Sequence, residues 1–175
     1  NTEKFMVYEV PVIIDYLVKS HNYYLSSRLP LIEQNICVQI NKFEKKHPLL
    51  YVFYEFFLIY KRDLKEHFKE EEDCLFPFAN SLYEFAKNNS TNELENIKKL
   101  QIKALDFIEK HKNEPSELSS LNDAFLKYKS EESNPSVFKG ILNQLNDFQK
   151  DLNIHAQIED QILIKKINNL LIKIK

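Results

Sequence analysis

Glycine and tryptophan are nearly missing from this chain of 175 residues, which contains one glycine and no tryptophan. Glycine supplies most of the positive-φ positions that the tight turns of β-hairpins require. A fold with many short strands and many tight turns is therefore disfavoured. Long helices need few such positions, so the sequence predicts an all-α protein.

Cysteine is also scarce. The two cysteines, Cys37 and Cys74, form no Cys-x-x-Cys pair and lie in amphipathic helical patterns. A disulfide scaffold is therefore disfavoured, and the composition fits a reducing compartment, so we expect a cytoplasmic protein. Cys74 follows a histidine of the apolar stripe by seven residues, and we expect it to face the core as a small apolar side chain.

Two other missing features are a strong net charge and a long apolar run. The formal net charge is −2, without the basic excess that is typical of nucleic-acid binding. No apolar run reaches membrane length, and no secretory signal is visible. We therefore expect neither nucleic acid nor a membrane as a partner. The chain begins at Asn1 rather than at a methionine, as expected of a processed or excised chain.

What the chain does have is apolar residues at helical spacing through four long segments. The expected helices run from Pro11 to about Phe43, from Pro48 to Pro77, from Thr91 to about Phe125 and onward from Pro135, with a shorter helix over 78–88. Proline should break or kink the first helix at Pro30 and the third at Pro115, and Ser90 or Thr91 is the expected N-cap. Short connections between long amphipathic helices predict an up-down-up-down four-helix bundle, forming a single domain over residues 1–175.

The histidines of the chain follow a duplicated pattern. In each half, two histidines are followed by a glutamate four residues after the second of them. The pattern consists of His21, His67 and Glu71 in the first half and of His111, His155 and Glu159 in the second half. Residues i and i+4 share one face of a helix. Each His-x-x-x-Glu can therefore aim an imidazole and a carboxylate at one point.

These six residues are predicted to bind metal. A single histidine on an apolar stripe is more often a satisfied core residue than a ligand, but here all four helices carry one. Burying a carboxylate without a charged partner is costly. The alternative is that the glutamates pair with lysine or arginine, yet only Arg28, two turns from His21, shares a stripe near that level.

Other polar residues nearby are less suited to be ligands. His47 lies at a corner between helices, and we expect it to be a capping or surface residue. Glu70 and Glu72 flank a ligand glutamate off the stripe, so we expect both in solvent. Glu114, three residues after the third histidine, is an alternative ligand that the spacing leaves open.

The ligand types indicate which metal the site binds. Zinc sites usually hold one tetrahedral ion, and calcium or magnesium prefers mostly oxygen ligands. Imidazole mixed with bridging carboxylate suits iron, with manganese second. We therefore predict two iron ions in a non-haem di-iron centre, joined by an oxo or hydroxo bridge. Open coordination positions would admit dioxygen, nitric oxide or peroxide.

Several stretches of the chain match motifs of a known family. They are His21 with Leu29-Pro30; His47-Pro48-Leu49-Leu50; His67-Phe68-Lys69-Glu70-Glu71-Glu72-Asp73-Cys74-Leu75-Phe76-Pro77; and His155-Ala156-Gln157-Ile158-Glu159-Asp160-Gln161-Ile162-Leu163. These stretches resemble the hemerythrin-like iron–sulfur cluster repair di-iron proteins, also called repair of iron centres. The resemblance spans roughly residues 12–167. The last motif continues with Ile164-Lys165 where the family has Phe-Pro, and the third-helix match depends mainly on spacing.

The resemblance implies a hemerythrin-like bundle with the same six ligands, the glutamates bridging the two irons. It also implies a role in protecting or restoring iron–sulfur proteins after oxidative or nitrosative stress, with damaged iron–sulfur proteins and small ligands such as oxygen or nitric oxide as partners. The cysteine-containing N-terminal domain common in that family is not in this sequence.

Two alternatives stay open. One is a hemerythrin-like module that binds or senses oxygen or nitric oxide. Oxygen carriers of this kind use a further third-helix histidine at the position of Pro115. The other is a structural bundle without metal. The sequence does not decide whether the protein is an enzyme or whether it forms a homodimer.

Overall fold

The computed structural model describes residues 2–43, 48–113 and 135–174. These residues form helices joined by short turns, and none of them lies in a strand, so the predicted all-α class is confirmed. None of the described helices is long and apolar enough to cross a membrane.

The chain divides into two compact units. The first unit consists of residues 1–21, 67–114 and 153–175, and the second consists of residues 22–66 and 115–152. All six predicted ligands belong to the first unit.

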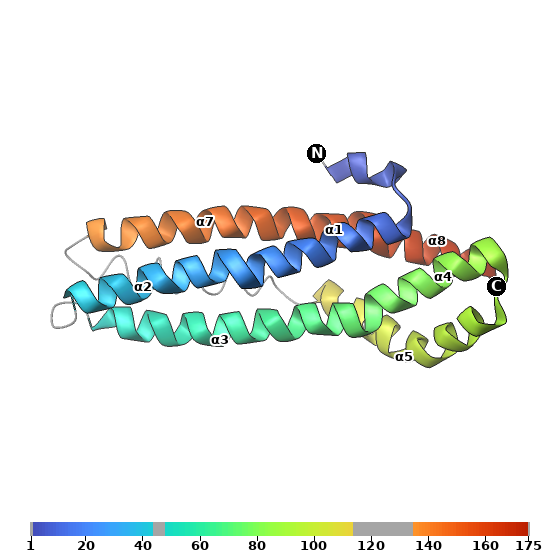
Figure 1. Ribbon diagram of the computed structural model, residues 1–175, viewed down its shortest axis with the longest axis horizontal. Helices are drawn as coiled ribbons and strands as arrows, with labels where there is room; N and C mark the ends of the chain where they lie inside the picture. Colours follow the sequence, from blue (N-terminus) through green and yellow to red (C-terminus); the bar gives the residue numbers. More distant parts are fainter. Residues whose placement is uncertain (1, 44–47, 114–134, 175) are drawn as a thin grey trace. The chain divides into compact units, whose positions relative to one another are not determined.

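Four helical segments of the first unit alternate in direction, which confirms the predicted up-down-up-down order (Figure 1). In chain order they are α1 (Val10–Tyr23); the end of α3 (Leu49–Glu70) with α4 (Phe76–Asn88); α5 (Thr91–Asn113); and the end of α7 (Pro135–Ile158) with α8 (Ile164–Ile174). The segment α4 packs along α5.

The core of the first unit is built from the apolar stripes of these segments. Fully burying one large aliphatic or aromatic side chain contributes about 1.5–3 kcal/mol. The buried members are Val10, Ile13, Ile14, Leu17, Leu75, Phe76, Phe78, Ala79, Leu82, Ile97, Ala104, Phe107, Ile108, Ile158, Ile162, Leu163, Ile164 and Ile167.

In the residues that the structure describes, three π-helical turns interrupt the α-helices without ending them. They are η2 (Tyr24–Arg28), η3 (Glu71–Leu75) and η4 (Glu159–Leu163), and after each turn a backbone N–H bonds to the carbonyl five residues earlier. In the first two, Pro30 and Pro77 follow soon after the turn. Pro77 was expected to end or bend its helix. Neither proline ends the helix, because the wider turn lets the chain continue. The third turn has Lys165 at that place, so proline is not required.

The connection between α4 and α5 is as expected. Asn89 adopts a left-handed conformation with φ of 49°, which asparagine tolerates well, and its N–H bonds to the carbonyl of Phe85 at 2.8 Å. The carbonyl of Ser90 accepts a hydrogen bond from the N–H of Leu94. Ser90 is thus the cap residue before α5, one of the two candidates that the sequence indicated.

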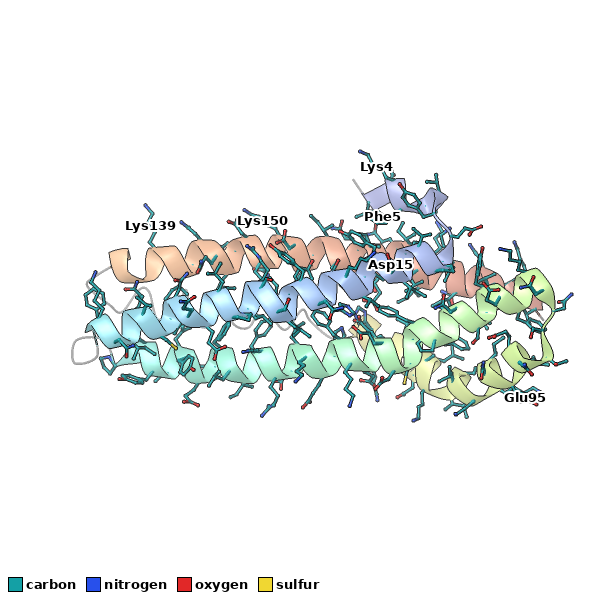
Figure 2. The ribbon with its side chains drawn as sticks, viewed as in Figure 1. Lys4, Phe5, Asp15, Glu95, Lys139 and Lys150 are labelled. Atoms are coloured by element: carbon teal, nitrogen blue, oxygen red, sulfur yellow. The ribbon has the colours of Figure 1, made fainter. Side chains whose placement is uncertain are left out.

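An N-terminal 3₁₀ turn, η1 (Thr2–Val7), was not expected from the sequence. Phe5 points from this turn toward α1, where its ring centroid lies 4.8 Å from that of Tyr16 (Figure 2). Lys166 of α8 donates a hydrogen bond to the carbonyl of Met6 at 2.9 Å. The turn therefore contacts α1 and α8, the first and the last α-helix of the first unit.

The second unit contains α2 (Leu29–Phe43) and most of α3 and α7, both of which run opposite to α2 (Figure 1). Glu33 of α2 accepts hydrogen bonds from Lys61 and Tyr54 of α3, and Asn35 donates one to Gln144 of α7. Polar contacts thus fix α2 against both neighbours.

Candidate metal centre

The structure brings all six predicted ligands together in the first unit. Each histidine lies near the C-terminal end of a different helix, and each glutamate is the first residue of a π-turn. The positions are His21 in α1, His67 in α3, His111 in α5 and His155 in α7, with Glu71 opening η3 and Glu159 opening η4. π-turns inside helices are frequent at functional sites.

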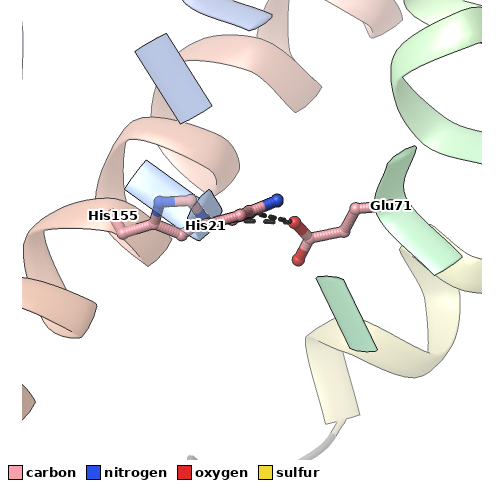
Figure 3. A group of neighbouring side chains, drawn as sticks. All are labelled: His21, Glu71 and His155. Atoms are coloured by element: carbon pink, nitrogen blue, oxygen red, sulfur yellow. Dashed lines mark hydrogen bonds and ion pairs between the residues drawn. The ribbon is translucent and has the colours of Figure 1, made fainter. Parts of the chain in front are cut away.

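Three buried side chains, His21, Glu71 and His155, form the first of two possible ion positions found among the described residues (Figure 3). Nε2 of His21 lies 2.9 Å from Oε2 of Glu71 and 3.1 Å from Nε2 of His155. The His155 Nε2 lies 3.9 Å from the same glutamate oxygen. Two ligand atoms bound at right angles, each about 2.1 Å from one ion, lie about 3 Å apart. These spacings fit a shared cation.

The second possible position uses His67, Glu71 and His111. Nε2 of His67 lies 2.8 Å from Oε1 of Glu71, which is the oxygen that does not face His21. The rings of His67 and His111 stack with centroids 5.2 Å apart. Glu71 therefore presents one oxygen to each position, as a carboxylate that bridges two ions would.

Glu159 is buried but stands further from the imidazoles. Its Oε2 lies 3.9 Å from Nε2 of His111, and it belongs to neither three-residue group. The two glutamates are equivalent in the sequence pattern, but they are not equivalent in the structure.

The carboxylate oxygens at the centre lack aligned hydrogen-bond donors. Among the described residues, neither oxygen of Glu71 nor Oε1 of Glu159 accepts an aligned bond, although imidazole nitrogens face Glu71 closely. Within the described part of the chain, the ion pairs of both glutamates involve histidines only. Arg28, the basic alternative, pairs with Asp151 in the second unit. A divalent cation therefore fits this set of nitrogen and oxygen donors.

Burial and neighbours move the pKa values of the two glutamates in opposite directions. Burial by itself would raise the pKa of Glu71, but the imidazoles of His155, His21 and His67 hold it well below its ordinary value. Burial, and then the negative charge of Glu71, raise the pKa of Glu159 well above its ordinary value. Burial also lowers the pKa of His155. Without metal, the surroundings thus favour the ionised form of Glu71 and the protonated form of Glu159.

Metal-free protein carrying Glu159→Gln is expected to be more stable than the wild type, by a margin that grows as pH rises from the ordinary glutamate value of 4.5 toward the raised pKa of Glu159. The pKa of Glu159 is higher in the folded state than its ordinary 4.5. The folded wild type therefore binds more protons than the unfolded chain, and its stability falls as pH rises through that window. Glutamine stays neutral. Thermal unfolding with a chelator present measures this, with exposed Glu70→Gln as the control. Parallel pH curves for wild type and Glu159→Gln would contradict the prediction.

Two acidic residues that were not among the predicted ligands contact the site. Oε1 of Glu72 lies 2.7 Å from Nδ1 of His21, and Oδ1 of Asp160 lies 3.1 Å from Nδ1 of His111. Glu72 was expected in solvent; its side chain is 40% exposed, but its carboxylate reaches a buried imidazole. One sequence feature could have indicated both contacts, since each of these acidic residues directly follows a predicted ligand glutamate.

Aromatic rings enclose the imidazoles. The ring of His21 stacks on Phe68 with centroids 4.0 Å apart and planes 10° apart, and on Phe76 with centroids 5.6 Å apart. Phe107 lies 5.6 Å from the ring of His67. These apolar surfaces lower the local dielectric constant and so strengthen electrostatic interactions at the donor atoms.

Some expectations fall on residues outside the described ranges, namely those for His47, Glu114 and Pro115. Cys74, expected to face the core, is half-buried and forms no disulfide.

The comparison with known protein families agrees with this geometry. A family model described as the hemerythrin HHE cation binding domain matches residues 14–167, a range that contains all six predicted ligands and most of the chain. Searches among curated proteins and among solved structures give no match. The family match, together with the helical fold, shows that this chain belongs to the hemerythrin family of HHE cation-binding domains.

Proposed function

We propose that this chain binds two iron ions and acts as a non-haem di-iron protein of the iron–sulfur cluster repair type, which protects or restores iron–sulfur proteins after oxidative or nitrosative stress. The observation that carries the di-iron proposal is Glu71, whose two oxygens face two separate groups of histidines. Iron bound there would supply a redox-active centre open to small ligands such as oxygen or nitric oxide.

The side chains would divide the work of holding the two ions. His21 and His155 present Nε2 from a buried position, and Glu71 contributes its negative charge to both ions. Glu159 lies close enough to join the second ion after losing its proton, since its carboxylate is 3.9 Å from His111. Metal binding favours such proton loss because a ligand carboxylate must be deprotonated.

The two positions differ in exposure, and this difference supports a donor function. The side chains of His67 and His111 are 25% and 14% exposed, whereas that of His21 is 1% exposed. An ion in the second position is therefore nearer to solvent and easier to transfer. A protein that returns iron to a damaged cluster needs one exchangeable ion and a site that survives its loss.

Anaerobic reconstitution is expected to load about two irons per chain, and the loaded protein should restore activity to a dehydratase whose iron–sulfur cluster has been damaged by oxidant. Iron analysis and dehydratase assays measure the two parts separately. His67→Ala should reduce the restoration more than it reduces the iron in the buried position. Stoichiometric zinc in place of iron would sink the di-iron assignment.

A second candidate is a hemerythrin-like module that binds or senses oxygen or nitric oxide. The burial of His21, Glu71 and His155 favours it, since buried ligands retain their ion. Exposing the reduced protein to air and then removing the oxygen distinguishes the candidates. An adduct that reverses fully, with no recovery of the dehydratase, would favour this second function over repair.

A further inference from the structure

The residue after each ligand glutamate is acidic, and each of these acidic residues contacts a histidine from another helix. Glu72 reaches Nδ1 of His21 and Asp160 reaches Nδ1 of His111, at 2.7 and 3.1 Å. Their side chains are 40% and 48% exposed, so most of an ordinary surface ion pair's energy would be screened. The partners of Glu72 and Asp160 are imidazoles of the two ion positions. Each contact can therefore matter by orienting the imidazole ring rather than by the energy of an ion pair.

The contacts also have the same chemical direction in both halves. In each histidine, Nδ1 faces the acidic residue, while Nε2 faces a ligand glutamate, Glu71 at 2.9 Å from His21 and Glu159 at 3.9 Å from His111. An ionised carboxylate only accepts hydrogen bonds, so Nδ1 must carry the proton that it shares with Glu72 or Asp160. Nε2 then has no proton, and its lone pair points toward the proposed ion position.

We propose that Glu72 and Asp160 are positioning residues that hold the Nδ1–H tautomers of His21 and His111, so that both rings offer Nε2 to the metal. This inference rests on the proposed metal centre. A hydrogen bond from the second ring nitrogen fixes the tautomer and orientation of a metal-binding histidine.

Aromatic packing alone does not provide this function. The stack of His21 on Phe68 fixes the plane of the imidazole. A ring rotated by 180° about its Cβ–Cγ bond keeps the same plane and stacks equally well. This rotation exchanges the positions of the ring nitrogens with those of ring carbons. Only a directional contact such as the one to Glu72 distinguishes the two orientations. The π-turn η3 contributes to this orientation because Glu71 and Glu72 are its first two residues. Glu71 contacts Nε2 of His21, and Glu72 contacts Nδ1 of the same ring.

The test measures Fe(II) affinity by competition with a chelator, without oxygen, for Glu72→Ala and Asp160→Ala. Loss of an outer hydrogen-bond partner typically costs about 10- to 100-fold in metal affinity, and we expect each variant to lose that much. Glu72→Gln and Asp160→Asn keep an accepting oxygen and should recover most of the affinity. Exposed Glu70→Ala and Asp73→Ala remove a nearby charge as matched controls and should bind as wild type.

A second measurement detects the tautomer itself. Proton NMR of the Fe(II)-loaded protein in water should show slowly exchanging imidazole N–H signals from His21 and His111, and each alanine variant should lose the signal of its own partner. Wild-type affinity together with both protected signals in the alanine variants would overturn the proposal. Equal losses in the alanine and amide variants would overturn it too. Absence of Fe(II) binding by the wild type would instead refute the proposed metal centre.

Discussion

Replacing Glu71 with alanine is expected to remove iron from both positions, leaving less than about one tenth of the wild-type content. Loss of an outer-shell partner alone costs about 10- to 100-fold in affinity, and loss of a shared ligand should cost more. One oxygen of Glu71 lies 2.9 Å from His21 and the other lies 2.8 Å from His67. A single substitution therefore deprives both groups of their negative charge. Iron analysis after anaerobic reconstitution measures the effect.

Comparison with neighbouring variants makes this prediction specific. Glu70→Ala removes an exposed carboxylate next to the site and should retain the wild-type iron content. Glu159→Ala should also lose iron, but less than Glu71→Ala, since the Oε2 of Glu159 lies 3.9 Å from Nε2 of His111 and Glu159 belongs to neither group. Equal iron retention by Glu71→Ala and Glu70→Ala would show that Glu71 binds no metal.

Iron loading is expected to raise the unfolding temperature by roughly 8–16 °C. A ligand at about 1,000 times its dissociation constant stabilises the folded state by about 4.1 kcal/mol, and a protein of this size gains about 2–4 °C per kcal/mol. The metal-free protein is less stable because it buries two carboxyl groups close together. Without a cation, the negative charge of Glu71 raises the pKa of Glu159. The cation neutralises both. Calorimetry of loaded and metal-free protein measures the shift.

The pH dependence of the shift follows from the same groups. Well above pH 6.5 His155 is neutral in both the folded and the unfolded state, because its folded pKa lies below that ordinary value. As pH rises from the ordinary glutamate value of 4.5 toward the raised pKa of Glu159, the metal-free protein loses stability, whereas the loaded protein has no such loss. The gain from iron should therefore increase with pH. A gain that is absent, or that decreases with pH, would mean that the two carboxylates are solvated or paired otherwise.

Local physics explains why much of the fold could be predicted from the sequence. Helical periodicity depends on residues three or four positions apart, so the stripes of α1, α3, α5 and α7 are visible without any tertiary information. The His-x-x-x-Glu spacing is equally local. It predicted the pair His67 with Glu71, which lie 2.8 Å apart, whereas His155 lies in a group with His21 and Glu71 rather than with Glu159. A turn such as Asn89-Ser90 also follows from neighbouring residues alone.

Other features depend on helices that are distant in the sequence. Glu72 contacts His21 across 51 positions, and His21 approaches His155 across 134. No periodicity reports such distances, which is why Glu72 was assigned to solvent. The π-turns were likewise missed, because one of them forms without the proline that follows the other two.

The sequence by itself determined the helical class and the six residues directed at one level of the bundle, because both follow from the period of the α-helix. Only the tertiary structure decided that Glu71 faces two groups of histidines while Glu159 stands apart. The same holds for Glu72 and Asp160, which became partners of the site through packing. The physical reason is that distances, burial and pKa values arise from contacts between segments, and two equivalent motifs acquire different environments when they pack.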